Sequence, residues 1–395
     1  MLIYHQPTNM IRRKKEITPD VVVKLLINSA LVVKLLTDYP EAEARLNRAL
    51  KIAEASGQKN LKNKTLAETA ALYYLWGKFD EGLALAQQII SASGTDYNEN
   101  QASALNTSGN IHLRLCEFDL AEKYFRQALE FYGKLQMDTS IGIVTNNIAN
   151  IYNVRGDYQQ AYQLYLQALD CFEKQGDIFR TAHAMHAVSQ MLLGMKKTDQ
   201  AKDFLSKSLV LRKRIQDYRG MVNNLLIQIG IFTDEKDFEG ARKKLRQADE
   251  IIAEHKIADP HLKVYREGEA GIFYFFADEY NRAEECFLRL INLSQQMKLL
   301  TFLAGGYSWL GKTRVFRDGN NIGISDIRKG VELADSGNLP YELKSAWIYL
   351  AECYSRLGNL EMAEQAAQNY AQVAIKQGTP QEEVDAEMIK MLSVK

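Results

Sequence analysis

The sequence lacks the features that mark membrane, nucleic-acid-binding and secreted proteins. Lysine plus arginine equals aspartate plus glutamate, 49 against 49, so no net charge favours nucleic acid or an anionic membrane. The most apolar N-terminal stretch, residues 21–36, is interrupted by Lys24, Asn28 and Lys34, which makes it too short and too polar to span a bilayer. We therefore expect a cytoplasmic protein with no nucleic-acid and no membrane partner.

Cysteine and proline are also scarce. No two cysteines form a C-x-x-C pair, and they lie far apart, at Cys116, Cys171, Cys286 and Cys353. We interpret them as reduced and mostly buried small apolar residues. The six prolines do not gather in a linker, and no Ser/Gly-rich stretch separates one half of the chain from the other. This pattern argues against two independent domains.

What the sequence does contain is an internal repeat. An aromatic or equivalent anchor residue is followed by a small residue three positions later, a large one at seven and a small or apolar one at ten. Tyr158, Ala161, Tyr165 and Ala168 are one example. The anchors recur at a nearly constant step, at positions 39, 79, 118, 158, 198, 238, 280, 320 and 360.

Each repeat unit is expected to form two helices. Offsets of three, four and seven place apolar residues on one helical face, and a second helical stretch precedes each anchor. The pattern predicts an all-α solenoid of about nine stacked antiparallel helix pairs. We expect an N-terminal extension over residues 1–17, the array over residues 18–378, and a capping helix over residues 379–395. Thr18 and Thr379 are predicted N-caps, with Pro19 and Pro380 at the first helical position.

The ninth unit carries a family resemblance. It contains Trp347, Leu350, Ala351 and Tyr354 in the spacing W-x2-L-A-x2-Y, followed by Ala363. This resembles the tetratricopeptide repeat, whose signature is W-x2-L-G-x2-Y and then A-x3-F. The resemblance covers roughly residues 20–380. The units are longer than usual for this repeat, and extended units of this kind are similar to those of peptide-sensing bacterial regulators and Pins-type adaptors. The resemblance implies a right-handed superhelix in which the first helix of each unit lines a concave groove.

Residues 306–313 spell G-x-x-x-x-G-K-T, the pattern of a phosphate-binding loop. Gly311, however, corresponds to Gly271 in the preceding unit and to Ala351 in the following one, which is the small position of the repeat. A phosphate-binding loop needs a preceding strand and a non-helical backbone. We therefore interpret Gly311 as the point where two helices approach closely. An ATP-binding enzyme remains a remote alternative.

Other candidates for catalysis or metal binding are weak. His183 and His186 lie three residues apart, but no third ligand is spaced to join them. No G-x-S-x-G motif occurs. The basic runs at residues 12–15 and 212–214 are interpreted as solvated faces or helix ends. We predict a protein that is not an enzyme and that has no cofactor, metal or catalytic residues.

The predicted groove positions lie on the first helix of each unit, at fixed offsets before the anchor. Amide side chains recur there, and an amide can both donate to and accept from a peptide backbone. The predicted peptide-binding residues are Asn106, Asn110, Asn146, Asn147, Asn150, His183, His186, Gln190, Asn223 and Lys312. Lys312 is predicted to be a groove cation for a ligand carboxylate, in a lining that also includes Glu269, Trp309 and Glu352. The alternative is a solvated polar face whose asparagines bond their own neighbours.

These observations predict a signalling or assembly scaffold that binds a protein or peptide in extended conformation. A second hypothesis is that the chain is the peptide-sensing module of a larger signalling protein.

Overall fold

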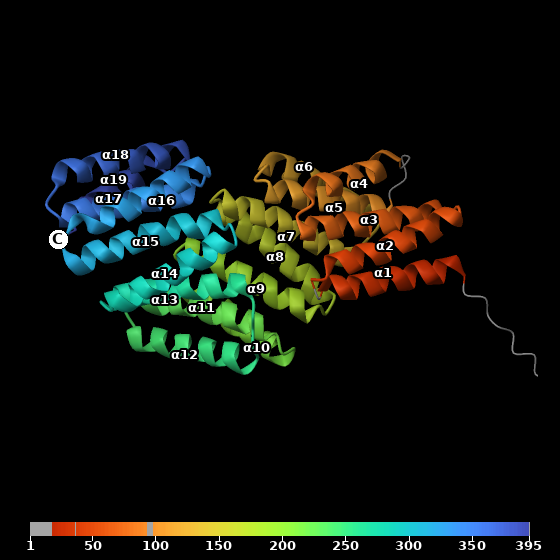
Figure 1. Cartoon of the computed structure of the whole chain (residues 1–395), viewed down its shortest axis with the longest axis horizontal. Coiled ribbons are helices and arrows are strands. Elements are labelled where there is room, and N and C mark those ends of the chain that lie inside the picture. The colour runs from red at the N-terminus through yellow and green to blue at the C-terminus, as the bar shows by residue number, and fades with distance from the viewer. Residues whose placement is uncertain (1–17, 36, 93–97, 395) are drawn as a thin grey trace, which may run out of the picture. The chain divides into compact units, whose positions relative to one another are not determined.

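The computed structural model describes residues 18–35, 37–92 and 98–394, and within them every regular element is a helix (Figure 1). The all-α prediction is confirmed. The chain divides into two compact units, residues 1–197 and 198–395, called unit 1 and unit 2. The predicted extension at residues 1–17 and the basic run at residues 12–15 lie outside the described residues. No helix in the described ranges is long and apolar enough to cross a membrane.

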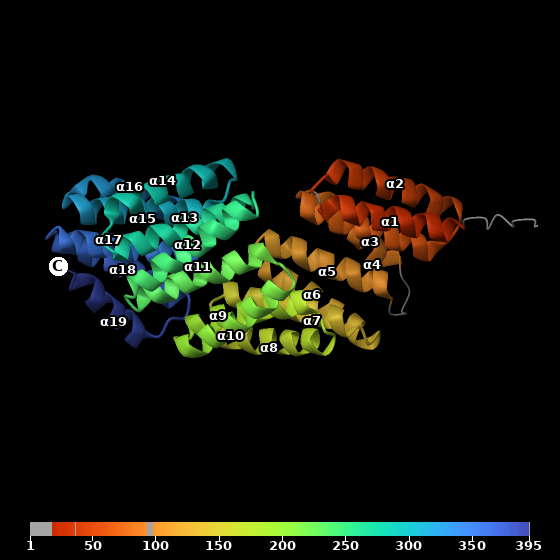
Figure 2. The same cartoon turned by 90° about the horizontal axis from the view of Figure 1, so that it is seen from below.

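Unit 1 is a series of consecutive helices (Figure 2). They are α1 (Pro19–Leu35), α2 (Tyr39–Ala55), α3 (Lys59–Trp76), α4 (Phe79–Ala92), α5 (Glu99–Arg114), α6 (Phe118–Lys134), α7 (Asp138–Val154), α8 (Tyr158–Lys174) and α9 (Ile178–Gly194). Consecutive helices pack against each other along this unit.

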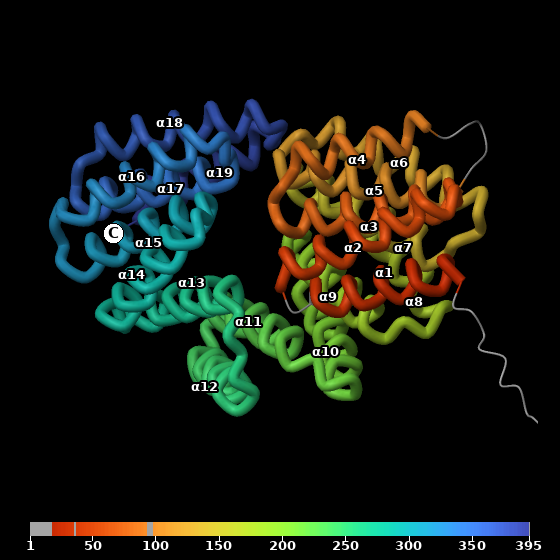
Figure 3. The backbone as a smooth tube through the Cα atoms, turned by 45° about the vertical axis from the view of Figure 1, so that its right-hand side comes forward, coloured from red at the N-terminus to blue at the C-terminus, as the bar shows by residue number. Residues whose placement is uncertain are grey.

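Unit 2 continues the same pattern and ends in three helices that lie together, α17, α18 and α19 (Figure 3). Its elements are α10 (Thr198–Arg214), α11 (Tyr218–Asp234), α12 (Phe238–Glu254), α13 (Pro260–Phe276), α14 (Tyr280–Gln296), α15 (Leu300–Asp318), the 3-10 turn η1 (Asn321–Gly323), α16 (Ile324–Ser336), α17 (Pro340–Arg356), α18 (Leu360–Lys376) and α19 (Gln381–Leu392).

The anchor residues of the repeat are the first residues of the second helices. Helices α2, α4, α6, α8, α10, α12, α14 and α18 each begin at their anchor. The eighth repeat differs because Asn320 caps the 3-10 turn instead, its side chain accepting from the Ile322 amide at 2.9 Å. Helix α16 therefore begins four residues late, at Ile324. The division between the two units falls between α9 and α10, the helices of the fifth predicted pair.

The helix ends follow from capping chemistry. Aspartates before α8, α9, α11 and α12 accept from the backbone amide three residues on, as Asp237 does from Gly240 at 2.9 Å. At the other end, helices close with a residue in the left-handed region, such as Gly156 (φ 79°) or Lys236 (φ 60°). Helix α19 corrects one prediction: it begins at Gln381, and Pro380 is its extended N-cap rather than its first helical residue.

The core is built where large and small residues of the repeat meet. The residues seven after the anchors are buried, including Phe125, Tyr165 and Phe287. A Cβ on Gly109 would lie 2.5 Å from Phe125 Cδ1, and one on Gly311 would lie 2.3 Å from the Gly323 carbonyl oxygen. A real Cβ atom essentially never lies this close to another heavy atom, so the absence of a side chain at these glycines lets two helices approach. The structure thus supports the interpretation of Gly311 as a packing position.

One smaller prediction is wrong. The cysteines are not mostly buried, because Cys116 is exposed and Cys171 is half-buried, although Cys286 and Cys353 are buried. All four are free thiols. The basic run at residues 212–214 ends helix α10, as one of its two interpretations predicted, although Arg212 itself is 4% exposed.

Candidate functional site

Amide side chains from two consecutive first helices of unit 1 form a connected row. Asn147 on α7 donates from its Nδ2 to the Oδ1 atoms of Asn106 and Asn110 on α5, at 3.2 Å in each case. All three side chains are partly exposed. We call Asn106, Asn110, Asn146, Asn147 and Asn150 the amide row. The structure joins Asn106, Asn110 and Asn147 by hydrogen bonds, which is the kind of bonding between neighbours that the alternative interpretation predicted.

The remaining two members of the amide row have different surroundings. The Asn150 Oδ1 accepts from the Tyr165 hydroxyl at 2.5 Å. Tyr165 is 2% exposed, and burial raises the pKa of its hydroxyl. Asn150 therefore satisfies a buried donor. The Asn146 Oδ1 is buried and has no hydrogen-bond partner among the described residues. Such an acceptor costs roughly 1–3 kcal/mol, so the amide row is not fully satisfied by the protein itself.

Three predicted residues lie on α9, at the end of unit 1. His183 and Gln190 are exposed, and His186 is half-buried. Their spacing of three and four puts them on one helical face. In the described part of the chain, no group of three or more His, Cys, Asp or Glu residues is placed to hold a metal ion. A peptide-binding role for these three residues stays a prediction.

Asn223 on α11 belongs to unit 2 and is half-buried. Its neighbour Asn224 is fully buried and donates to the Leu205 carbonyl oxygen at 3.3 Å. The two consecutive asparagines thus face different surroundings, one in the core and one at the predicted groove position.

The structure corrects the prediction for Lys312. Its side chain is buried, and its Nζ lies 2.5 Å from the Glu352 Oε2. Four aromatic rings surround the ammonium, with centroids 4.4–5.7 Å away: Tyr349, Trp309, Phe275 and Phe316. The ammonium already has a carboxylate and aromatic faces as partners. It is therefore not the solvent-facing groove cation that the sequence predicted, and two predicted lining residues are its partners.

The phosphate-loop spelling is an accident of the helix. Residues 306–313 all lie inside the continuous helix α15. The Thr313 hydroxyl donates to the Trp309 carbonyl oxygen at 2.8 Å, and Lys312 is paired with Glu352. The backbone amides of such a helix interior are used in helical hydrogen bonds and cannot face a phosphate. The alternative of ATP binding through this segment is therefore wrong.

Glu269 on α13 is a predicted lining residue whose carboxyl group has a shifted pKa. Burial, with the nearby charge of Asp234, raises the pKa of Glu269 to about 7, against the lowering effect of the Tyr265 hydroxyl hydrogen bond. A Cβ on Gly230 of α11 would lie 3.4 Å from the Glu269 Oε2, so the glycine leaves room beside the carboxylate. Sequence reasoning missed Tyr265, although it stands at a predicted groove position, four residues before Glu269.

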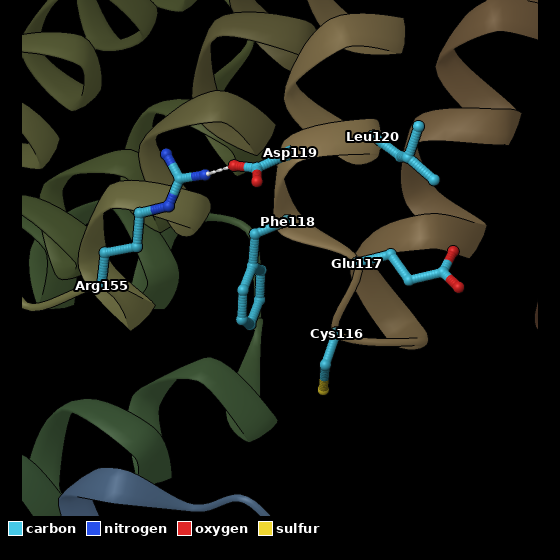
Figure 4. Close-up of a pocket in the computed structure, with 6 residues that line it drawn as sticks. All are labelled: Cys116, Glu117, Phe118, Asp119, Leu120 and Arg155. Atoms are coloured by element: carbon cyan, nitrogen blue, oxygen red, sulfur yellow. Dashed lines mark hydrogen bonds and ion pairs between the residues drawn. The ribbon is translucent and has the colours of Figure 1, made fainter.

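A shallow open hollow lies at the turn between α5 and α6, and no residue of the amide row lines it (Figure 4). The Arg155 Nη2, at the end of α7, lies 2.6 Å from the Asp119 Oδ1, and the Cys116 sulfur points away from this pair (Figure 4). The residues that line the hollow are Cys116, Glu117, Phe118, Asp119, Leu120 and Arg155. The hollow could not be predicted from the sequence. Charged residues that form ion pairs between helix ends have the same sequence pattern as charged residues that face solvent.

The comparisons with known proteins support the repeat. Residues 102–134 and 140–214 match family models described as tetratricopeptide repeat, and these segments include the whole amide row. These segments are therefore tetratricopeptide repeats, as the sequence pattern predicted. A curated relative, Protein KINESIN LIGHT CHAIN-RELATED 1 of Arabidopsis thaliana, is 25% identical over 187 residues, which are 44% of this chain and 30% of that protein. The chain spans less than a third of the length of the curated relatives it matches.

Two solved structures share the fold along most of the chain. A Rap protein complexed with competence and sporulation factor is 15% identical, with a TM-score of 0.67, and the match covers 90% of this chain and 98% of that one. The apo form of the quorum sensor NprR from B. thuringiensis is 12% identical, with a TM-score of 0.58 over 89% and 98% of the two chains. At these identities the likeness concerns the fold alone.

Proposed function

We propose that this tetratricopeptide-repeat chain is a non-enzymatic, cytoplasmic scaffold that binds an extended peptide, or an extended segment of a partner protein, through the amide row. The observation that carries the proposal is the row itself. Asn147 of α7, eleven residues before its anchor, donates hydrogen bonds to Asn106 and Asn110 of α5, which stand twelve and eight residues before theirs. Tetratricopeptide repeats at these residues, and a structural neighbour whose name states a bound factor, support this reading.

The hydrogen bonds within the row still leave it able to bind a ligand. Asn147 uses its two N–H groups on its neighbours, whereas Asn106 and Asn110 take part with their oxygens and retain NH₂ groups that can donate to peptide carbonyls. One net hydrogen bond contributes about 0.5–1.5 kcal/mol, and micromolar affinity needs roughly 8 kcal/mol. The ligand must therefore contact several amides together with apolar surface.

The test is a matched pair of variants in the full chain. Peptides selected from a random displayed library on the wild-type protein serve as the probe. We expect Asn106→Ala combined with Asn147→Ala to weaken their binding about tenfold to a hundredfold, because two or more hydrogen bonds are lost. The control is Asn292→Ala, on the second helix α14, where the amide accepts only from Gln296 at 3.3 Å.

Both variants should keep the helical circular dichroism of the wild type, because none of these three asparagines is buried. If the selected peptides bind the double variant as tightly as the wild type, the amide row is not the binding site. Asn150→Ala is unsuited to this test, because it would leave the Tyr165 hydroxyl buried without its acceptor.

The second candidate function is a peptide-sensing module of a larger signalling protein. It is favoured by the shared fold with the Rap protein and the quorum sensor, which extends over both units. A sensor must change conformation when the ligand binds, whereas a scaffold need not. Spin labels at the exposed Cys116 in unit 1 and at Leu360→Cys in unit 2 measure the distance between the two labels with and without peptide. Cys171→Ser prevents labelling of the half-buried Cys171. A distance that is unchanged by saturating peptide would leave only the scaffold.

A further inference from the structure

Helix α1 carries an apolar stripe that no described residue of unit 1 covers. Val21, Leu25 and Val32 are 44%, 60% and 58% exposed, and Asn28 between them is exposed as well. Steps of four, three and four residues place them on one helical face. We call Val21, Leu25, Asn28 and Val32 the α1 stripe. The other side of α1 packs against α2 and α3 (Figure 1).

The repeat shows what this face normally does. One repeat later, in α3, the corresponding positions are held by Leu61, Thr65, Glu68 and Leu72. Leu61, Thr65 and Leu72 are 5%, 0% and 0% exposed. In α5 all four corresponding residues are buried: Asn100, Ala104, Thr107 and Ile111. Helices α3 and α5 also pack against the preceding pairs, through α2 and α4. The α1 stripe therefore corresponds to the face that packs against the preceding helix pair in α3 and α5. Among the described residues, no preceding pair covers it in α1.

The last helix of the chain is built differently. The outward residues of α19 are mainly polar, with one exposed large apolar side chain, Ile389, at 70% exposure. The exposed polar residues are Gln381, Glu382, Glu383, Asp385 and Lys390. A polar outer face is how terminal helices keep solenoids soluble. Helix α19 has this face, whereas the exposed face of α1 carries Val21, Leu25 and Val32, and large apolar side chains grouped on one helical face are normally covered.

We propose that a second copy of this chain covers the α1 stripe, with the two α1 helices packed antiparallel across a two-fold axis. The stripe has the alternating four- and three-residue spacing of a coiled-coil seam. A two-fold interface requires a surface that is complementary to itself. An antiparallel arrangement centred between residues 26 and 27 places Val21 against Val32 of the second copy, and Leu25 against its Asn28.

Charge supports the antiparallel direction. Asp20 stands at the start of α1 and Lys34 at its end. Antiparallel pairing brings each Asp20, which also lies 2.9 Å from the Lys24 Nζ of its own helix, near Lys34 of the second copy, whereas parallel pairing would place the two Asp20 carboxylates side by side. Asn28 adds specificity, because a polar residue in such a seam selects one register at some cost in stability.

Head-to-tail association is disfavoured by α19. That arrangement would bury the carboxylates of Glu382 and Asp385 against the apolar α1 stripe, and burying unpaired charges is costly. The association therefore closes as a dimer and does not propagate as a filament.

The first test measures oligomeric state on the full chain by sedimentation velocity at concentrations from about 1 to 100 µM. We expect a dimer for the wild type. Leu25→Glu should raise its dissociation constant by at least about a hundredfold, because each dimer then holds two charges in its seam. Ile389→Glu is the matched control, an apolar position on α19 that is 70% exposed against 60% for Leu25, and should leave the dimer unchanged. Circular dichroism checks that both variants remain helical.

The second test reads the register and does not depend on a disruptive variant. Chains carrying Leu25→Cys and chains carrying Asn28→Cys, both with Cys116→Ser, should form a mixed disulfide when combined. Asp20→Lys and Lys34→Asp should each weaken the dimer, and the two together in one chain should restore it.

A wild type that stays monomeric at the highest concentration would overturn the proposal and assign the cover of the α1 stripe to residues 1–17 or to another protein. The proposal would also be overturned if the dimer survives Leu25→Glu. It would likewise be overturned if Leu25→Cys chains cross-link to each other in preference to Asn28→Cys chains.

Discussion

The same repeat positions have different chemistry in unit 1 and in unit 2. Eight residues before the anchor, unit 1 places Asn110 and Asn150, and unit 2 places Lys312 and Glu352. The asparagines are partly exposed, whereas Lys312 is 6% exposed in a cage of aromatic rings. Large aromatic neighbours such as Trp309 fill space that small side chains leave open in unit 1. A groove position in a solenoid is therefore open only where its neighbours are small enough to leave it so.

The largest test of this contrast removes the buried cation. Lys312→Ala should destabilise unit 2 by about 3–5 kcal/mol, because it leaves the Glu352 carboxylate without its partner. Urea unfolding followed by tryptophan fluorescence measures the effect, since Trp309 lies beside the pair. Asn110→Ala, at the equivalent position of unit 1, should cost less than about 1 kcal/mol. Equal costs for the two changes would remove the distinction between the units.

A double variant separates the charge from the packing. Lys312→Met combined with Glu352→Gln removes both charges and keeps most of the volume. It should recover the larger part of the stability that Lys312→Ala loses, because replacing both members of a buried ion pair is often close to neutral.

Asn150 shows that unit 1 also has a polar residue with a structural role. Asn150→Ala should cost about 1–3 kcal/mol, because the buried Tyr165 hydroxyl loses its acceptor at 2.5 Å. The double variant Asn150→Ala with Tyr165→Phe should lose less than the sum of the two single variants. Thermal unfolding monitored by circular dichroism provides the comparison, and strict additivity would mean that the hydrogen bond has no role.

Glu269 predicts a pH dependence that belongs to unit 2. Burial raises the pKa of Glu269 from 4.5 to about 7, so between these values the folded state holds a proton that the unfolded state has lost. Stability from this group is therefore present below about pH 4.5 and is lost as the pH rises through 7. We expect the difference in unfolding free energy between the wild type and Glu269→Gln to fall by about 3 kcal/mol between pH 4.5 and pH 8. A flat difference in unfolding free energy would show that the carboxyl is solvated.

The smallest expected effect concerns the helix ends. Five consecutive helices of unit 2 close with a non-glycine residue at positive φ: Gln216, Lys236, Lys256, Asp278 and Lys298. Unit 1 has both kinds of residue at positive φ, glycine as at Gly156 and Gly176 and non-glycine as at Cys116 and Lys196. Lys236→Gly should stabilise unit 2 by about 0.5–1 kcal/mol, because the left-handed conformation strains a residue with a Cβ. Gly156→Lys should show the opposite sign in thermal unfolding of unit 1.

Much of the fold could be read from the repeat pattern. The anchors marked the starts of the second helices, and the positions of Gly109 and Gly311 marked the closest helix contacts. The pattern failed locally where a capping side chain intervened, as at Asn320, whose hydrogen bond to Ile322 delays helix α16. It also could not locate the division between α9 and α10, because no change in composition marks it.

The candidate site was predictable in position more than in character. Asn106, Asn110 and Asn147 were identified by spacing, and the structure brings them into hydrogen-bond contact. Lys312 was identified by the same spacing and lies in an aromatic cage instead. The difference depends on rings from three helices, α13, α15 and α17, whose contacts with one another do not appear in any single repeat.

The sequence by itself determined the helices, their pairing and which small residues hold them together, because these depend on spacing within one repeat unit and on capping groups close by in the chain. Only the tertiary structure decided which polar side chains stay partly exposed and which are buried with partners inside the protein. Burial and ion pairing depend on the volumes and charges of residues far apart in the chain, and so Lys312 and Asn110 can share one repeat position and still differ in their exposure and in their partners.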